Sequence, residues 1–240
     1  METIGFSTGS LALGDVKSAL GLLERHRTGC IELSALRVDE LTPLLRCLPD
    51  LPLSGYRSIS IHAPSAFARG EERRIAADLL PVAAARGWPV ILHPDAIHDF
   101  GIWRDFGDRV AIENMDRRKP GGRTVRELRP VFARLPDASF CFDVAHARQC
   151  DTSMTEAFRL LDSFGDRLAE VHVSELDAHS RHVRLSRAAI HACREIAHLI
   201  PIDVPVIVEA PVRSHEIEDE LMAGLEAMGR SLTVARRVAA

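Results

Sequence analysis

Residues 139–147 read SFCFDVAHA, a short apolar run that ends on Asp143 and is followed by His146 three residues later. A run of this length and composition is typical of a buried β-strand. Two interpretations of its end stay open. Asp143 is either the N-cap of a following helix that happens to have a histidine nearby, or part of a metal or catalytic site at the mouth of a barrel.

Seven similar runs occur along the chain, and amphipathic stretches of helical period lie between them. The eight expected strands are 3–7, 30–34, 58–62, 89–93, 110–113, 139–143, 169–172 and 205–209. The expected helices are 15–27, 38–47, 70–86, 99–106, 123–134, 153–164, 184–198 and 214–229. This alternation predicts an α/β protein with a single (β/α)₈ TIM barrel domain over residues 1–240. A doubly wound open sheet is the main alternative, but no GxGxxG motif follows the first strand.

The alternation of side chains within the strands separates an apolar face from a polar one. If the last residue of each strand points into the barrel, the opposite face consists of large apolar residues, as expected for packing against helices. The inward face is polar and predicts a site at one end of the barrel. Six strands end on a histidine or a carboxylate, namely His62, His93, Glu113, Asp143, His172 and Glu209. One layer below, Glu32 and Glu170 need polar partners, because an unpaired buried carboxylate is costly.

These strand-end groups predict a divalent metal site. Each one alone could be a helix cap, a salt-bridge partner or a satisfied polar residue. Together, three carboxylates at one barrel mouth would repel one another unless a cation compensated them. The three imidazoles complete a set of nitrogen and oxygen donors suited to zinc, manganese, cobalt or iron(II). We expect manganese or zinc, at one site or at two.

The composition argues against several other classes of protein. The net charge of −4 and the short basic clusters disfavour nucleic acid as the main partner, since such proteins need a basic surface for phosphates. No apolar run reaches the roughly 18 residues of a membrane span. The five cysteines have no CxxC spacing, and the N-terminus lacks the features of a signal peptide. We therefore expect a cytoplasmic protein with reduced thiols and no membrane partner.

The motifs at the strand ends resemble those of the xylose isomerase-like barrel superfamily, which contains sugar isomerases, sugar epimerases and endonuclease IV. They are HAPS (62–65), LHPD (92–95), IENM (112–115), FDVAH (142–146), VHVSE (171–175) and VEAP (208–211). The resemblance implies one metal held by the four residues Glu113, Asp143, His172 and Glu209. It matches His62 and His93 to ligands of a second metal in the endonuclease branch. His146 matches a residue that is a third-metal ligand in one branch and a substrate contact in the other.

The chain departs from both branches of this superfamily. The loop 179–182 has no aspartate two residues before His182, where the endonucleases carry one. Ser65 and Ala66 stand where the endonucleases carry a bulky pair that wedges into DNA. Ala178 stands where the epimerases usually carry an arginine.

The resemblance implies, as the leading hypothesis, an isomerase or epimerase acting on a small sugar, sugar acid or sugar phosphate. Glu113 and Glu209 would transfer the proton, and His146 would donate a hydrogen bond to the oxygen that gains charge. Glu175 and His182 are candidate substrate contacts. The alternatives are an endonuclease IV-like multinuclear phosphodiesterase and a non-catalytic ligand-binding barrel.

Overall fold

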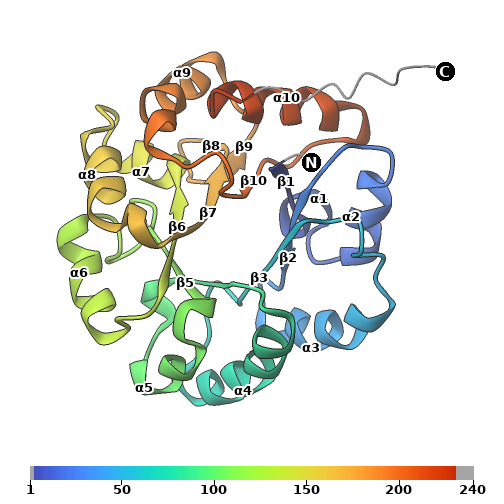
Figure 1. The fold of residues 1–240 in the computed structure, drawn as a ribbon, viewed down its shortest axis with the longest axis vertical. Helices are drawn as coiled ribbons and strands as arrows, with labels where there is room; N and C mark the ends of the chain where they lie inside the picture. The colour runs from blue at the N-terminus through green and yellow to red at the C-terminus, as the bar shows by residue number, and fades with distance from the viewer. Residues whose placement is uncertain (1–2, 231–240) are drawn as a thin grey trace.

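The computed structural model describes residues 3–230. Within them, eight parallel strands follow one another in chain order around a closed barrel (Figure 1). The barrel strands are β1 (Ile4–Ser7), β2 (Cys30–Ser34), β3 (Ser58–His62), β4 (Val90–Leu92), β5 (Val110–Glu113), β6 (Ser139–Asp143), β7 (Leu168–Val173) and β10 (Val206–Val208). All eight expected strands are present with nearly the expected bounds, which confirms the (β/α)₈ barrel.

Helices surround the barrel and pack on its outer face (Figure 1). The α-helices are α1 (Thr8–Ala12), α2 (Val16–Leu23), α3 (Val38–Cys47), α4 (Arg69–Arg86), α5 (Phe100–Trp103), α6 (Val125–Arg134), α7 (Val144–Cys150), α8 (Thr155–Phe164), α9 (Arg187–Ile196) and α10 (Ile217–Ala227). The 3₁₀ turns are η1 (Leu48–Asp50), η2 (Pro94–Ala96), η3 (Arg104–Arg109), η4 (Gly165–Arg167), η5 (Ala197–Leu199) and η6 (Ser214–Glu216). Among residues 3–230, no helix is both long and apolar enough to cross a membrane.

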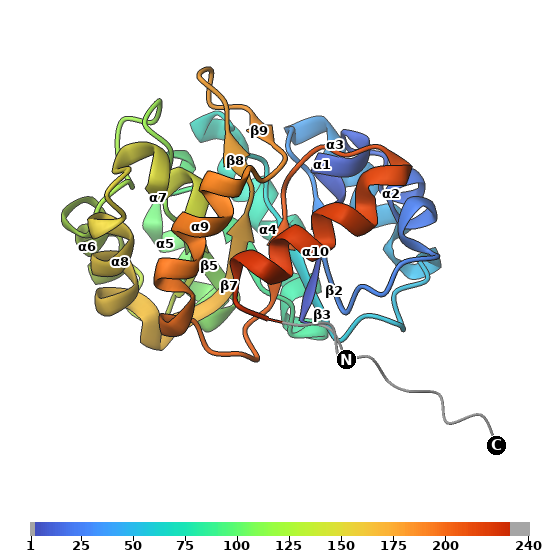
Figure 2. The same cartoon turned by 90° about the horizontal axis from the view of Figure 1, so that it is seen from above.

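Three parts of the fold differ from the expected pattern. The helix expected over 99–106 is present as α5 followed directly by η3, and the helical backbone is interrupted inside η3 at Gly107, which adopts φ 58° and ψ −128°. The short helices α1 and α7 directly follow strands β1 and β6 and were not expected. A small antiparallel hairpin of β8 (Glu175–Leu176) and β9 (His182–Val183) follows β7, and Figure 2 shows it projecting from one end of the barrel.

The core divides into an outer and an inner part, as the alternation of the strands predicts. Outward residues such as Ile31 and Phe140 belong to one continuous apolar core with the helices. Inside the barrel a separate small cluster contains Ile91, Ala111 and Cys141. Polar side chains occupy the remainder of the interior, which leaves the carboxyl ends of the strands available for a site.

Candidate metal centre

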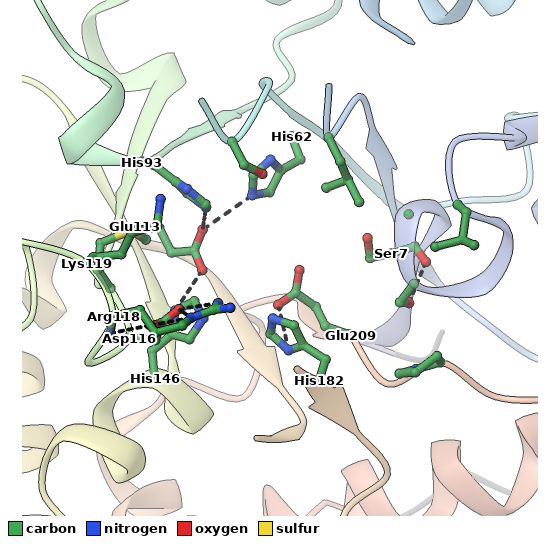
Figure 3. Close-up of a pocket in the computed structure, with 17 residues that line it drawn as sticks. Ser7, His62, His93, Glu113, Asp116, Arg118, Lys119, His146, His182 and Glu209 are labelled. Atoms are coloured by element: carbon green, nitrogen blue, oxygen red, sulfur yellow. Dashed lines mark hydrogen bonds and ion pairs between the residues drawn. The ribbon is translucent and has the colours of Figure 1, made fainter. Parts of the chain in front are cut away.

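A cavity of about 600 Å³ opens at the carboxyl ends of the strands (Figure 3). Polar side chains from different strand ends and loops converge on it, among them His62, His93, Glu113, His146, His182 and Glu209. Barrel register explains this convergence, because parallel strands of similar length end at the same level. Asp143 of β6, for example, is paired with His172 of β7.

Four of the expected ligands lie together. Glu113, Asp143, His172 and Glu209 each place one donor atom within 4.8 Å of the others. His172 Nδ1 lies 3.4 Å from Glu209 Oε2 and 3.6 Å from Glu113 Oε1. These residues lie at or next to the carboxyl ends of β5, β6, β7 and β10, which are consecutive around the barrel. The arrangement offers three carboxylates and one imidazole to a single point.

Several donor atoms in this region lack a hydrogen-bond partner among the described residues, as expected for ligands of a cation. Among residues 3–230, no group makes a hydrogen bond to Glu113 Oε2, Asp143 Oδ2 or His172 Nδ1, although all three atoms are buried. Buried polar atoms without partners are costly and rare in native proteins. A divalent ion with nitrogen and oxygen ligands would satisfy Asp143 Oδ2 and His172 Nδ1, whereas Glu113 Oε2 faces His62 and His93.

Two histidines lie close to one carboxylate oxygen of Glu113. Its Oε2 lies 3.1 Å from His93 Nε2 and 3.4 Å from His62 Nε2. His62, His93 and Glu113 form a second group whose donor atoms lie within 4.8 Å of one another. These three residues could hold a second ion that shares Glu113 with the first.

The ring orientation of His62 suits a ligand role. Its Nδ1 lies 2.6 Å from the carbonyl oxygen of Ala63, to which it can donate a hydrogen bond. A proton on Nδ1 leaves the lone pair on Nε2, the atom that faces Glu113. Backbone contacts of this kind commonly fix the tautomer of a metal-binding histidine.

The position of Asp143 is compatible with both interpretations of its sequence, as a helix N-cap and as a candidate metal ligand. Its Oδ1 accepts a hydrogen bond from the backbone N–H of His146 at 2.6 Å, so it is the N-cap of α7. Its Oδ2 is buried without a hydrogen-bond partner among the described residues, and Asp143 belongs to the candidate metal group. The side chain of Asn114, which sequence reasoning did not single out, holds the backbone of Asp143 through two hydrogen bonds. The position of Asn114 directly after Glu113 is the signal in the sequence that could have identified it as a residue of the site.

His146 and His182 lie on the side of the cavity near Asp143, and with it they form a third group of potential ligands. His146 Nδ1 lies 2.8 Å from the carbonyl oxygen of Asn114, and in the described chain its Nε2 has no hydrogen-bond partner. His182 Nδ1 lies 2.8 Å from the hydroxyl of Ser174. Both imidazoles line the cavity and can meet a ligand there.

Burial and close packing shift the protonation of the site. Burial raises the pKa of Asp143 to about 7, and repulsion by Glu209 and Glu113 adds to that effect. Burial disfavours the charged forms of His62 and His146, but nearby carboxylates outweigh it and raise their pKa values to about 9 and about 10. Imidazolium charges thus balance the carboxylates, a role that a divalent ion would take over as the protons leave.

Two carboxylates near the site are engaged elsewhere. Glu175 does not line the cavity: its Oε1 accepts from Arg148 at 2.9 Å and its Oε2 from the backbone of Ser186 at 3.0 Å. The hairpin turns the Glu175 side chain toward α7 and α9, and the role of Glu175 as a substrate contact stays a prediction. Asp116, a lining residue that sequence reasoning missed, is paired with Arg118 at 2.7 Å.

No protein-family model and no curated protein matched the sequence. Solved structures do match it. A D-tagatose 3-epimerase-like protein is 16% identical with a TM-score of 0.62, over 94% of this chain and 98% of the other. Endonuclease IV from Thermus thermophilus is 20% identical with a TM-score of 0.59, over 94% and 98%. A candidate sugar phosphate isomerase/epimerase from Anabaena variabilis is 16% identical with a TM-score of 0.54, over 92% and 88%. The likeness shows that this chain shares the (β/α)₈ barrel fold of these structures.

Proposed function

We propose that this chain is a divalent-metal-dependent isomerase or epimerase acting on a small sugar, sugar acid or sugar phosphate. The observation that carries the proposal is the convergence of Glu113, Asp143, His172 and Glu209 beside a cavity of about 600 Å³. Small-molecule sites commonly have volumes of roughly 300–1,000 Å³. The names of two similar structures, a D-tagatose 3-epimerase-like protein and a sugar phosphate isomerase/epimerase, support the substrate class.

Glu113, Asp143, His172 and Glu209 would hold the ion. When bound, a divalent ion would supply Lewis-acid polarisation of neighbouring carbonyl and hydroxyl oxygens of the substrate. The protein would supply the proton transfer. One of the two glutamates, Glu113 or Glu209, would remove a proton from the carbon beside the carbonyl, and the other would return a proton to the substrate.

The surroundings of Glu209 favour its ionised form. Burial would raise the pKa of this carboxyl, but the charges of His172 and His182 outweigh burial and lower it. Ionisation is the state that a base requires, although the lower pKa also makes the carboxylate a weaker base. His146 would donate from Nε2 to the substrate oxygen that gains negative charge, since its Nδ1 is directed to the backbone of Asn114.

A second candidate function is an endonuclease IV-like multinuclear phosphodiesterase. The group formed by His62, His93 and Glu113 favours it, because a second ion there would suit phosphodiester hydrolysis. The ion pairs of the two cations that line the cavity argue against it. Arg118 is paired with Asp116, and Lys119 is paired with Asp95 at 2.8 Å. These pairs leave the two cations less free for phosphates, so we rank the isomerase first.

The proposal is tested by incubating the zinc- or manganese-loaded protein with a panel of ketoses, their phosphates and sugar acids in D₂O. Nuclear magnetic resonance then follows both the formation of an isomer and the entry of deuterium at the reacting carbon. We expect both signals for at least one substrate and their loss in Glu209→Gln. The variant Glu72→Gln, on helix α4 and outside the cavity, serves as the matched control and should retain them. No turnover and no deuterium entry across the panel would contradict the proposal.

A further inference from the structure

Two more carboxylates, Glu32 and Glu170, are enclosed in the barrel beside the candidate metal centre. Their exposed fractions are 0% and 1%. Each accepts a hydrogen bond from a serine hydroxyl: Ser34 Oγ donates to Glu32 Oε1 at 3.0 Å, and Ser60 Oγ donates to Glu170 Oε1 at 2.9 Å. No lysine or arginine forms an ion pair with either carboxylate among the described residues. Serine hydroxyls alone are modest compensation for two buried charges.

The imidazole of His172 lies between these carboxylates and the metal centre. On one side, Nε2 makes a hydrogen bond to Glu170 Oε1 at 3.2 Å and lies 3.4 Å from Glu32 Oε2. On the other side, Nδ1 lies 3.4 Å from Glu209 Oε2 and belongs to the candidate ligand group. Nε2 thus faces the barrel interior, where His172 also forms a group of potential ligands with Glu170 and Cys141, and Nδ1 faces the carboxylates of the candidate centre.

The position of the single proton on a neutral imidazole decides which nitrogen can bind a metal. A carboxylate that accepts the Nε2–H fixes the proton there and leaves the lone pair on Nδ1. The same contact restrains the ring and increases its basicity as a ligand. Glu170 is better suited to this role than Glu32, because only its contact with Nε2 has the geometry of a hydrogen bond in the described structure.

We propose that Glu170 is a positioning residue for the metal centre. Its carboxylate accepts the Nε2–H of His172 and so selects the tautomer whose Nδ1 binds the ion, while the hydroxyl of Ser60 restrains the carboxylate by donating to Oε1. This inference rests on the metal centre of the proposed function. It adds to that centre a group that contacts neither substrate nor ion.

The first test is zinc affinity, measured by competition with a chromophoric chelator on full-length protein. Glu170→Met keeps the approximate length of the side chain and removes the acceptor, and we expect zinc to bind about 10–100-fold more weakly. Glu170→Gln retains an oxygen acceptor and should restore much of the affinity. The matched control is Glu72→Met, since Glu72 is buried, accepts from Trp103 Nε1, and belongs neither to the candidate metal group nor to the cavity lining. It should lower thermal stability but leave zinc affinity unchanged.

The second test identifies the binding nitrogen directly. Long-range ¹H–¹⁵N spectra of the zinc-loaded wild type should show His172 protonated on Nε2 and ligated through Nδ1, a readout that does not depend on how well any variant folds. Ligation of His172 through Nε2, or unchanged zinc affinity in Glu170→Met, would overturn the inference. If Asp143→Asn loses zinc while Glu170→Met retains it, the metal centre stands and only the positioning role fails. A wild type that binds no zinc and no manganese would overturn both.

Discussion

The side chain of Asn114 exchanges two hydrogen bonds with the backbone of Asp143: its Oδ1 accepts from the N–H at 2.9 Å, and its Nδ2 donates to the carbonyl oxygen at 2.8 Å. Both residues are fully buried. The contact joins the end of β5 to the end of β6 and holds two ligand residues, Glu113 and Asp143, at a fixed separation. One neutral amide thereby holds two residues of the candidate metal group in place.

Replacement of Asn114 by alanine should therefore destabilise the protein. It leaves the buried N–H and carbonyl of Asp143 without their partner, and we expect the free energy of unfolding to fall by about 2–4 kcal/mol. Zinc affinity should fall as well, because Asp143 is released. Chemical denaturation measures the first effect, with Gln149→Ala as a control that removes partly exposed side-chain hydrogen bonds. A loss no larger than that of the control would show that the Asn114 contact does not restrain the site.

Substitutions of Asp143 should separate its two roles. Asparagine is as good an N-cap as aspartate, whereas alanine is a poor one. We expect Asp143→Asn and Asp143→Ala both to lose tight zinc binding, because neither supplies a carboxylate. Only the alanine variant should lose the cap of α7, and it should unfold more easily than the asparagine variant by about 1 kcal/mol. Calorimetric titration and denaturation of both variants test this, and tight zinc binding by Asp143→Asn would count against the ligand role.

The barrel itself depends on the close approach of β1 and β2 at Gly5. A Cβ atom at this position would lie 1.7 Å from the backbone oxygen of Cys30, and backbone atoms of a paired strand cannot move aside cheaply. We expect Gly5→Ala to destabilise the fold by at least about 3 kcal/mol, at or above the upper end of common overpacking costs. Gly21→Ala is the control, since nothing lies within 4 Å of a Cβ there. Similar melting temperatures for the two variants would contradict the described strand pairing.

Duplex DNA with an abasic site should not be cleaved efficiently, even with zinc or manganese supplied. An endonuclease needs cationic side chains that bind the DNA phosphates. It also needs a group that holds the duplex open once a nucleotide has been flipped out of it. Here the net charge is −4, Arg118 and Lys119 at the cavity are paired with acids, and the small Ser65 occupies the wall. A gel-based incision assay checks this expectation. Robust, salt-sensitive incision that disappears in Glu209→Gln would promote the phosphodiesterase above the isomerase.

The positions of the strand-end residues could be predicted because they depend only on the barrel topology and on the alternation of side chains along each strand. Once eight strands are recognised, a barrel brings their carboxyl ends together, and Glu113, Asp143 and His172 must meet there. The alternation also placed Glu170 on the inward face. It could not predict that the carboxylate of Glu170 would contact Nε2 of His172, since that depends on side-chain rotamers and on the twist of β7.

Residues outside the strands were less predictable. Glu175 follows a strand end in the sequence, as a site residue would, but the β8–β9 hairpin turns its carboxylate to Arg148. Asn114 acts through a neighbouring strand, so its role appears only when β5 and β6 are placed side by side. Helix α7 has seven residues, too few for a hydrophobic period, and its start is determined by the cap at Asp143.

The most direct test of the metal centre is a crystal structure of the protein grown with zinc, with anomalous diffraction collected on both sides of the zinc absorption edge. We predict an anomalous peak at bonding distance, about 2.0–2.2 Å, from one donor atom each of Glu113, Asp143, His172 and Glu209, with His172 contributing Nδ1. A weaker or absent peak at His62 and His93 would leave this account intact. Zinc-loaded crystals with no peak among the four residues, while the side chains retain the positions described here, would contradict it.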